Sequence, residues 1–191
     1  MHLIEFVGDV GSGKSTQARW LAESLNEQGS PSQTSKPTWR HISSGQLLRE
    51  RATPDEAERL AAGQMTPDEI ILPIMLDLLQ KAKNNGENLV LDGFPRNSVQ
   101  YQTLVQNGWQ LDAVVELIVS PEESLHRQLA RGRAGDTEEN WQIRHNFYTT
   151  ETQKMLQQMV ANRVLHLKVD GNGDMNATRN KVWQVWQGRA K

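Results

Sequence analysis

The stretch Gly8-Asp9-Val10-Gly11-Ser12-Gly13-Lys14-Ser15-Thr16 follows an apolar run, residues 3–7, and precedes a segment with helical spacing. This is the spacing of a phosphate-binding loop that opens onto a helix. Glycines let the backbone curl so that successive N–H groups point inward, and the helix N-terminus adds positive potential. A glycine-rich turn with a chance lysine is the alternative, but the strand before and the helix after favour a triphosphate site. The residues expected to form it are Gly11, Ser12, Gly13, Lys14, Ser15 and Thr16.

Short apolar runs alternate with longer stretches of helical spacing, which is typical of parallel strands joined by covering helices. Several runs are apolar almost without a break, as strands buried on both faces are. The pattern predicts a single α/β domain, residues 1–191, of the P-loop NTPase type with a doubly wound five-stranded parallel sheet. The expected strands are 3–7, 39–42, 89–91, 113–119 and 164–169. The expected helices are 14–27, 46–51, 67–83, 98–106, 122–130, 138–160 and 176–187.

Two of these helices have clear start signals. Thr66-Pro67-Asp68-Glu69 and Ser120-Pro121-Glu122-Glu123 each offer an N-cap, a proline at the first helical position and a glutamate three residues on. Pro73 is expected to kink the first helix. The stretch 29–37, rich in Ser, Thr, Gln and Pro, is expected to be a surface loop.

The composition excludes several classes of protein. With 21 Lys and Arg against 23 Asp and Glu, the net charge of −2 offers no broad attraction to nucleic acid or to an anionic membrane. The absence of cysteine excludes disulfides and thiolate chemistry. The longest apolar run, 70–76, is far shorter than the roughly 18 to 20 residues of a membrane span. The first residues lack the features of a secretion signal, so we expect a cytoplasmic protein.

A second motif, Asp92-Gly93-Phe94-Pro95-Arg96, follows the third apolar run, and Gln100 lies four residues further on. An acid at the carboxyl end of a buried strand, beside a phosphate loop, is well placed to hold Mg²⁺ through its water shell. Asp92 is therefore the predicted metal residue, together with the hydroxyl of Ser15. Arg96 would face the same crevice with a planar fork that suits a phosphate. Taken alone, the Asp-Gly pair would also fit an ordinary loop.

Together the two motifs resemble those of the adenylate kinase family of nucleoside monophosphate kinases, in its short-lid type. Further segments occur in the family's order over nearly the whole chain. The resemblance implies a small arm that binds the monophosphate, residues 43–68, and a short lid, residues 131–136. It also implies reversible transfer of a phosphoryl group from ATP with Mg²⁺ to a nucleoside monophosphate, with AMP as the expected acceptor and ADP as the product.

The resemblance assigns roles to residues outside the phosphate loop. Family members clamp the phosphates with arginines, because transfer spreads negative charge over several oxygens that a fixed bidentate cation can stabilise. The implied catalytic residues are Lys14, Arg96, Arg131, Arg133 and Arg144, and the implied contacts with ATP add Arg127, Arg131 and Gly173. The implied monophosphate-binding residues are Ser44, Arg49, Gln64, Met65, Thr66, Gly93, Phe94, Pro95, Arg96, Gln100, Arg133 and Arg144. For the arginines near the lid, a solvated helical face is the alternative.

Two positions depart from the family pattern. Gln46 stands where most relatives have an aspartate that orders water around Mg²⁺, so the metal is expected to rely on Asp92 and Ser15. Gly135 replaces the first of two consecutive acids after the lid arginine. The loss of this acid is expected to remove a brace for Arg133 and Arg144, and restoring an acid at position 135 is expected to raise kcat.

These departures leave other functions open. Thr66 carries a hydroxyl where relatives often have an aliphatic residue, so a kinase for another monophosphate such as CMP or UMP is one alternative. A nucleotide-binding regulatory protein with weak or lost activity is another. In each case the expected partners are small molecules only, with no nucleic acid and no membrane, and the chain is expected to be a monomer. The spacing of the five histidines gives no zinc pair.

Overall fold

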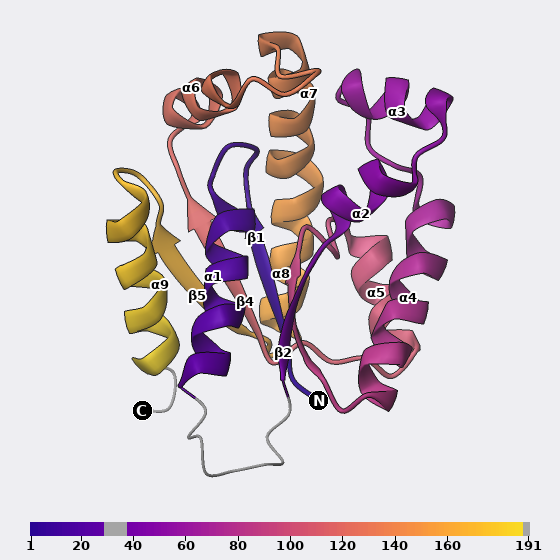
Figure 1. The fold of residues 1–191 in the computed structure, drawn as a ribbon, viewed down its shortest axis with the longest axis vertical. Coiled ribbons are helices and arrows are strands. Elements are labelled where there is room, and N and C mark those ends of the chain that lie inside the picture. The colour runs from indigo at the N-terminus through magenta and orange to yellow at the C-terminus, as the bar shows by residue number, and fades with distance from the viewer. Residues whose placement is uncertain (29–37, 189–191) are drawn as a thin grey trace.

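A five-stranded parallel sheet forms the centre of the molecule, in the strand order β2-β3-β1-β4-β5 (Figure 1). The computed structural model describes residues 1–28 and 38–188, so the loop expected at 29–37 lies outside the described residues. The strands are β1 Leu3–Gly8, β2 Trp39–Ser43, β3 Asn88–Asp92, β4 Ala113–Ile118 and β5 Leu165–Asp170. The predicted α/β fold with an all-parallel five-stranded sheet is confirmed.

Helices connect the strands and cover both faces of the sheet (Figure 1). On one face, α1 and α9 pack over Ile4, Phe6 and Val115, and Trp186 of α9 is only 5% exposed. On the other face, α4, α5 and α8 enclose a second core around Leu3 and Leu91. The helices are α1 Lys14–Glu27, α2 Ser44–Arg51, α3 Pro54–Ala61, α4 Asp68–Asn84, α5 Ser98–Gln106, α6 Pro121–Arg131, α7 Glu138–Phe147, η1 Tyr148–Thr152, α8 Gln153–Ala161 and α9 Met175–Gly188.

All five strands run in the same direction, so their carboxyl ends meet at one edge of the sheet. The phosphate loop follows β1 there, and the acid Asp92 ends β3 beside it, in register with Phe6. The segment with α2 and α3 leaves the same edge after β2 (Figure 1). This arrangement gathers the two sequence motifs at one end of the molecule.

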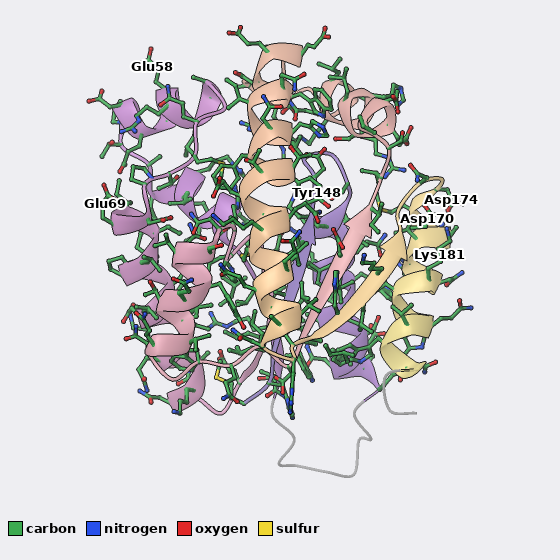
Figure 2. All side chains as sticks on the ribbon, turned by 180° about the vertical axis from the view of Figure 1, so that it is seen from behind. Glu58, Glu69, Tyr148, Asp170, Asp174 and Lys181 are labelled. Carbon is green, nitrogen blue, oxygen red and sulfur yellow. The ribbon has the colours of Figure 1, made fainter. Side chains whose placement is uncertain are left out.

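The long helix expected over 138–160 is interrupted. Its middle turn, η1, is a π-helix, so the element comprises α7, η1 and α8. Figure 2 shows Tyr148, the first residue of η1, on the long helix beside the strands. The Tyr148 hydroxyl donates to Glu116 of β4 at 2.9 Å. A π-turn adds one residue per turn, which re-aims the side chains that follow it.

Two start signals had different outcomes. Ser120 caps α6 as predicted, since its Oγ accepts a hydrogen bond from the Glu123 N–H at 3.2 Å. The predicted cap at Thr66 is wrong, because α4 begins one residue later, at Asp68, and has no side-chain cap. The helix α3 was not predicted, although Thr53 and Glu56 form a capping box at its start. No helix in the described part of the chain is long and apolar enough to cross a membrane.

Candidate active site

The phosphate loop wraps tightly around the start of α1. Gly11 and Gly13 have φ angles of 76° and 88°, a region that residues with a Cβ rarely adopt. A Cβ at Gly11 would also collide with the carbonyl oxygen of Ser124 on α6. No side chain caps the N-terminus of α1, which leaves its first backbone N–H groups available to an anion.

Lys14 extends from this helix start into the site. Its Nζ donates to the carbonyl oxygen of Asp9 at 3.1 Å. Burial lowers the pKa of the ammonium, while the carboxylates of Asp92 and Asp9 act in the opposite direction. The loop therefore presents a partly desolvated cation, which interacts more strongly with a phosphate than an exposed one does.

A cavity of about 460 Å³ opens between the phosphate loop, the end of β3, the segment with α2 and α3, and α7. Most of the predicted site residues line it: Lys14, Ser15, Ser44, Arg49, Gln64, Met65, Thr66, Asp92, Gly93, Pro95, Arg96, Gln100, Arg131, Arg133 and Arg144. The other predicted residues lie outside its wall: Gly11, Ser12, Gly13, Thr16, Phe94, Arg127 and Gly173. Phe94 is 1% exposed and packs in the core.

Asp92 lies at the floor of the cavity with 3% of its surface exposed. Burial alone would raise the pKa of its carboxyl, but His41, the charge of Lys14 and the hydroxyls of Ser15 and Ser43 together hold it well below the ordinary value. The carboxylate is therefore ionised, and with the Ser15 hydroxyl it forms an oxygen donor set of the kind that Mg²⁺ prefers. These residues fit the expected metal.

Gln46 takes no part in this donor set. It is exposed, its Nε2 donates to Glu50 at 2.7 Å, and it does not line the cavity. The departure at this position therefore leaves the cavity wall unchanged.

Two arginines from separate segments converge beside Gly45. Arg96 is fixed by a 2.7 Å bond from its Nε to the Gly93 carbonyl oxygen. A Cβ placed on Gly45 would lie 3.3 Å from Nη1 of Arg49 and 3.5 Å from Nη2 of Arg96. Burial and the positive charges of Arg133, Arg131 and Arg96, in that order, lower the pKa of Arg49. Cations held this close together repel one another, so the cluster favours a polyanion.

Asp136 braces the arginines of the lid region. Its carboxylate accepts from Nε and Nη2 of Arg131 at 2.9 and 2.5 Å, and from the backbone N–H of Arg133 at 2.9 Å. It also lies 3.9 Å from Nη1 of Arg144. Asp136 therefore holds the side chain of Arg131 and the backbone of Arg133, and the expectation that Gly135 removes a brace from the side chains of Arg133 and Arg144 stays a prediction.

Gly135 itself meets the other side of the cavity. Its φ is 81°, and a Cβ there would collide with the carbonyl oxygen of Ala61 at the end of α3. Arg144 donates from Nη2 to the Leu60 carbonyl oxygen at 3.0 Å. Asn140, which sequence reasoning missed, donates from Nδ2 to the carbonyl oxygens of both Ala61 and Gly135. The end of α3 and the segment from Gly135 to Arg144, which are far apart in the chain, therefore meet at the cavity.

Gln100 lies in the cavity wall with its amide orientation fixed. Its Oε1 accepts from the Arg96 N–H and its Nε2 donates to Asp68, both at 2.7 Å. A side-chain amide has two donor and two acceptor positions, so one of each remains for a ligand. Asp68, also missed, was assigned only to the start of a helix.

Arg127 and Gly173 meet on the far side of the phosphate loop. Arg127 donates to the carbonyl oxygens of Gly171 and Gly173 at 2.9 and 2.7 Å. Lys181 of α9 pairs with Asp170 at 2.7 Å, and Figure 2 shows both beside Asp174 at this edge. The loop after β5 is thus held close to α1, where Met175 approaches Gly13.

A parallel sheet that carries a phosphate loop at one edge, beside an arginine-lined cavity, defines a P-loop phosphotransferase. The chain matches the model of the adenylate kinase family over residues 6–163. It therefore belongs to this family, as the two motifs predicted, and is a nucleoside monophosphate kinase.

Individual relatives agree with the family match. An adenylate kinase of Synechococcus sp. strain WH7803 is 32% identical over 187 residues, which cover 93% of this chain and 94% of the relative. One from Mycobacterium sp. strain MCS is 37% identical over 164 residues, or 80% and 83% of the two chains. Adenylate kinase 1 of Synechocystis sp. is 35% identical over 183 residues, 90% of each.

Proposed function

We propose that this chain transfers the γ-phosphoryl group of ATP reversibly to AMP. The observation that carries the proposal is that one cavity is lined by Lys14 of the phosphate loop and by the paired arginines Arg49 and Arg96. A donor and an acceptor phosphate would therefore occupy the same enclosed space. The names of the relatives support adenylate as the nucleotide.

The residues would act by position and charge. Lys14 and the N–H groups at the start of α1 would hold the donor phosphates, and Arg49 and Arg96 would hold the acceptor phosphate. The acceptor oxygen is already ionised, so no proton has to be removed from it. Arg131, Arg133 and Arg144 would stabilise the charge that spreads over the transferring group.

Mg²⁺ would be held by Ser15 and, through water, by Asp92, and when bound it neutralises charge on the phosphate oxygens. The low pKa of Asp92 keeps that carboxylate ionised over the physiological range. The segments 43–68 and 131–136, which we propose as arm and lid, would exclude water that could otherwise intercept the phosphoryl group.

A coupled assay of ADP formation with AMP, CMP, UMP, GMP and dTMP tests the proposal. We expect kcat/KM to be highest with AMP. Equal or higher values with another monophosphate would contradict the choice of acceptor, and no turnover with any of them would contradict the reaction.

One observation favours a second acceptor. Thr66 lines the cavity and does not cap α4, so its hydroxyl is free to contact a base. A pyrimidine monophosphate such as CMP or UMP is therefore the second candidate. A regulatory protein without chemistry is less favoured, because the chain belongs to a family of kinases.

A further inference from the structure

A buried carboxylate lies directly behind the phosphate loop. Asp9 occupies a position that the loop pattern leaves open, and only 4% of its side chain is exposed. Its Oδ1 accepts from the N–H of Val10 at 2.7 Å, and its Oδ2 accepts from Ser124 at 3.2 Å. A negative charge here opposes the binding of a triphosphate to the same loop unless it is compensated.

His145 supplies a compensating group from α7. Its Nδ1 lies 2.5 Å from Oδ2 of Asp9, across 136 residues of sequence. The ring stacks on Trp141 with 4.6 Å between centroids, and Trp141 in turn donates to Ser124 at 2.8 Å. The imidazole is therefore held in place on both sides, while 20% of it stays exposed to exchange protons with water.

We propose that His145 is a positioning residue for ATP binding and that its protonated form offsets the charge of Asp9 behind the phosphate loop. The proposal rests on ATP as the donor in the proposed function. It makes the affinity for ATP depend on pH, since a histidine changes charge between about pH 5 and 8. ATP binding is strongest while the imidazole is charged and weakens as rising pH removes that charge.

Other titratable groups lie near the pair or on the same element. Lys14 donates to the backbone carbonyl oxygen of Asp9, and Asp9 is among the groups that raise the pKa of the neutral Tyr148, which donates to Glu116 of β4. Arg144 precedes His145 in α7. The α6 contact with Asp9 is the uncharged Ser124. Lys14 and Arg144 are cations, whereas Asp9 and a bound triphosphate are anions that attract the charged form of the imidazole. Bound ATP and the charged imidazole therefore stabilise each other, and the coupling is reciprocal.

Two substitutions separate charge from structure. Asn places an amide near the position of Nδ1, so His145→Asn keeps a donor toward Asp9 without a titratable charge. Asp9→Asn removes the carboxylate and still accepts from Val10. For His145→Asn, the KM for ATP should equal, at every pH, the value that the unmodified chain shows at high pH. For Asp9→Asn, the KM for ATP should equal, at every pH, the value that the unmodified chain shows at low pH. We expect the high-pH KM of the unmodified chain to exceed its low-pH KM about fivefold.

The experiment measures the ATP KM from pH 6 to 9 for the unmodified chain and both variants. Ratios between variants at each pH cancel the titration of ATP itself. His2→Asn is the matched control, because His2 also pairs with an aspartate, Asp112, at 3.2 Å, at the opposite edge of the sheet. Its profile should superimpose on that of the unmodified chain. Profiles that also superimpose for His145→Asn would overturn the proposal.

A second measurement does not depend on turnover. The titration of the His145 ring is followed by NMR with and without ATP, and the signal is assigned by its loss in His145→Asn. Saturating ATP should raise the titration midpoint by about 0.7 pH units, which is the fivefold coupling expressed on a logarithmic scale. If the protein binds ATP and the midpoint does not change, the proposed role of His145 is refuted, while the proposed function stands. If the protein does not bind ATP at any pH, both the role of His145 and the proposed function are refuted.

Discussion

The carbonyl oxygen of Ala61 accepts a 2.7 Å hydrogen bond from Nδ2 of Asn140, a residue 79 positions later in the chain. The same Nδ2 donates to Gly135 at 2.9 Å, and Gly63 packs against the Asn140 side chain. The end of α3 therefore meets Gly135 and the first turn of α7 over the cavity, with backbone so close that Gly135 has no room for a side chain.

Gly135→Asp is expected to lower kcat/KM for AMP by about tenfold or more, because the side chain would collide with Ala61 at a backbone angle that disfavours any Cβ. This reverses the expectation from sequence that an acid here would raise kcat. Gly132→Ala is the control, since its φ is also positive, at 65°, but no atom in the described part of the chain lies within 4 Å of the added Cβ. Steady-state kinetics measure kcat/KM for both variants. Equal losses of kcat/KM in the two variants would mean that backbone strain alone, and not the collision with Ala61, causes the effect.

Lys14→Ala is expected to reduce kcat by about a hundredfold or more, because a charge-assisted contact with the transferring phosphate is lost in a desolvated site. Lys81→Ala, which removes an exposed lysine paired with Asp77, should leave kcat unchanged. The coupled assay gives the rates, and circular dichroism checks that both variants are folded. Near-normal turnover of a folded Lys14→Ala would contradict the role of the phosphate loop.

Gln100→Leu is expected to reduce the preference for AMP over UMP by about tenfold, because one oriented donor and acceptor toward the base are lost. The comparison is the ratio of kcat/KM for the two acceptors. Gln102→Leu, on the exposed side of the same helix, provides the control. An unchanged ratio in Gln100→Leu would mean that other residues read the base.

Glu5→Gln is expected to stabilise the protein, and more so at higher pH. Glu5 is fully buried in β1, where its Oε1 accepts from the N–H groups of Gly93 and Phe94 at 3.1 and 3.2 Å, and its Oε2 has no hydrogen-bond partner among the residues that the structure describes. Burial, and then the charge of Asp92, raise its pKa. Each unit of that rise corresponds to about 1.4 kcal/mol.

The sign follows from proton binding. The folded state holds this proton to a higher pH than the unfolded state, so stability falls as pH rises from about 4.3 toward the raised pKa, and stays lower above it. Glutamine keeps the acceptor oxygen and cannot ionise. Urea unfolding from pH 5 to 8 should show a gain for Glu5→Gln that grows with pH. Glu58→Gln, which changes an exposed residue that points outward from α3 in Figure 2, should show no such trend, and a constant gain for Glu5→Gln would contradict the assignment.

Local chemistry made the strands and the phosphate loop predictable. Glycine spacing, a following lysine and uninterrupted apolar runs act within a few residues of one another, so the sequence alone indicates them. The same is true of Asp92, because the end of a buried parallel strand defines its place.

The tetrapeptide Thr-Pro-Asp-Glu shows where local chemistry stops. It occurs at residues 53–56, where Thr53 caps α3, and again at residues 66–69, where no cap forms. In the second copy, Asp68 accepts instead from Asn97 and Gln100, 29 and 32 residues away. The same tetrapeptide therefore adopts two different structures, because at residues 66–69 hydrogen bonds to distant residues replace the local capping hydrogen bonds.

The sequence by itself determined the sheet and the phosphate loop, since each depends on a short-range pattern, and the resemblance to the adenylate kinase family pointed to the cationic residues. Only the tertiary structure decided what holds those cations together. Arg49 and Arg96 repel each other, and Arg144 meets the Leu60 carbonyl across 84 residues of chain, so no local preference could place them. The pairing of Asp9 with His145 has the same origin: two separate segments share a buried charge only after the sheet has brought α7 onto the phosphate loop.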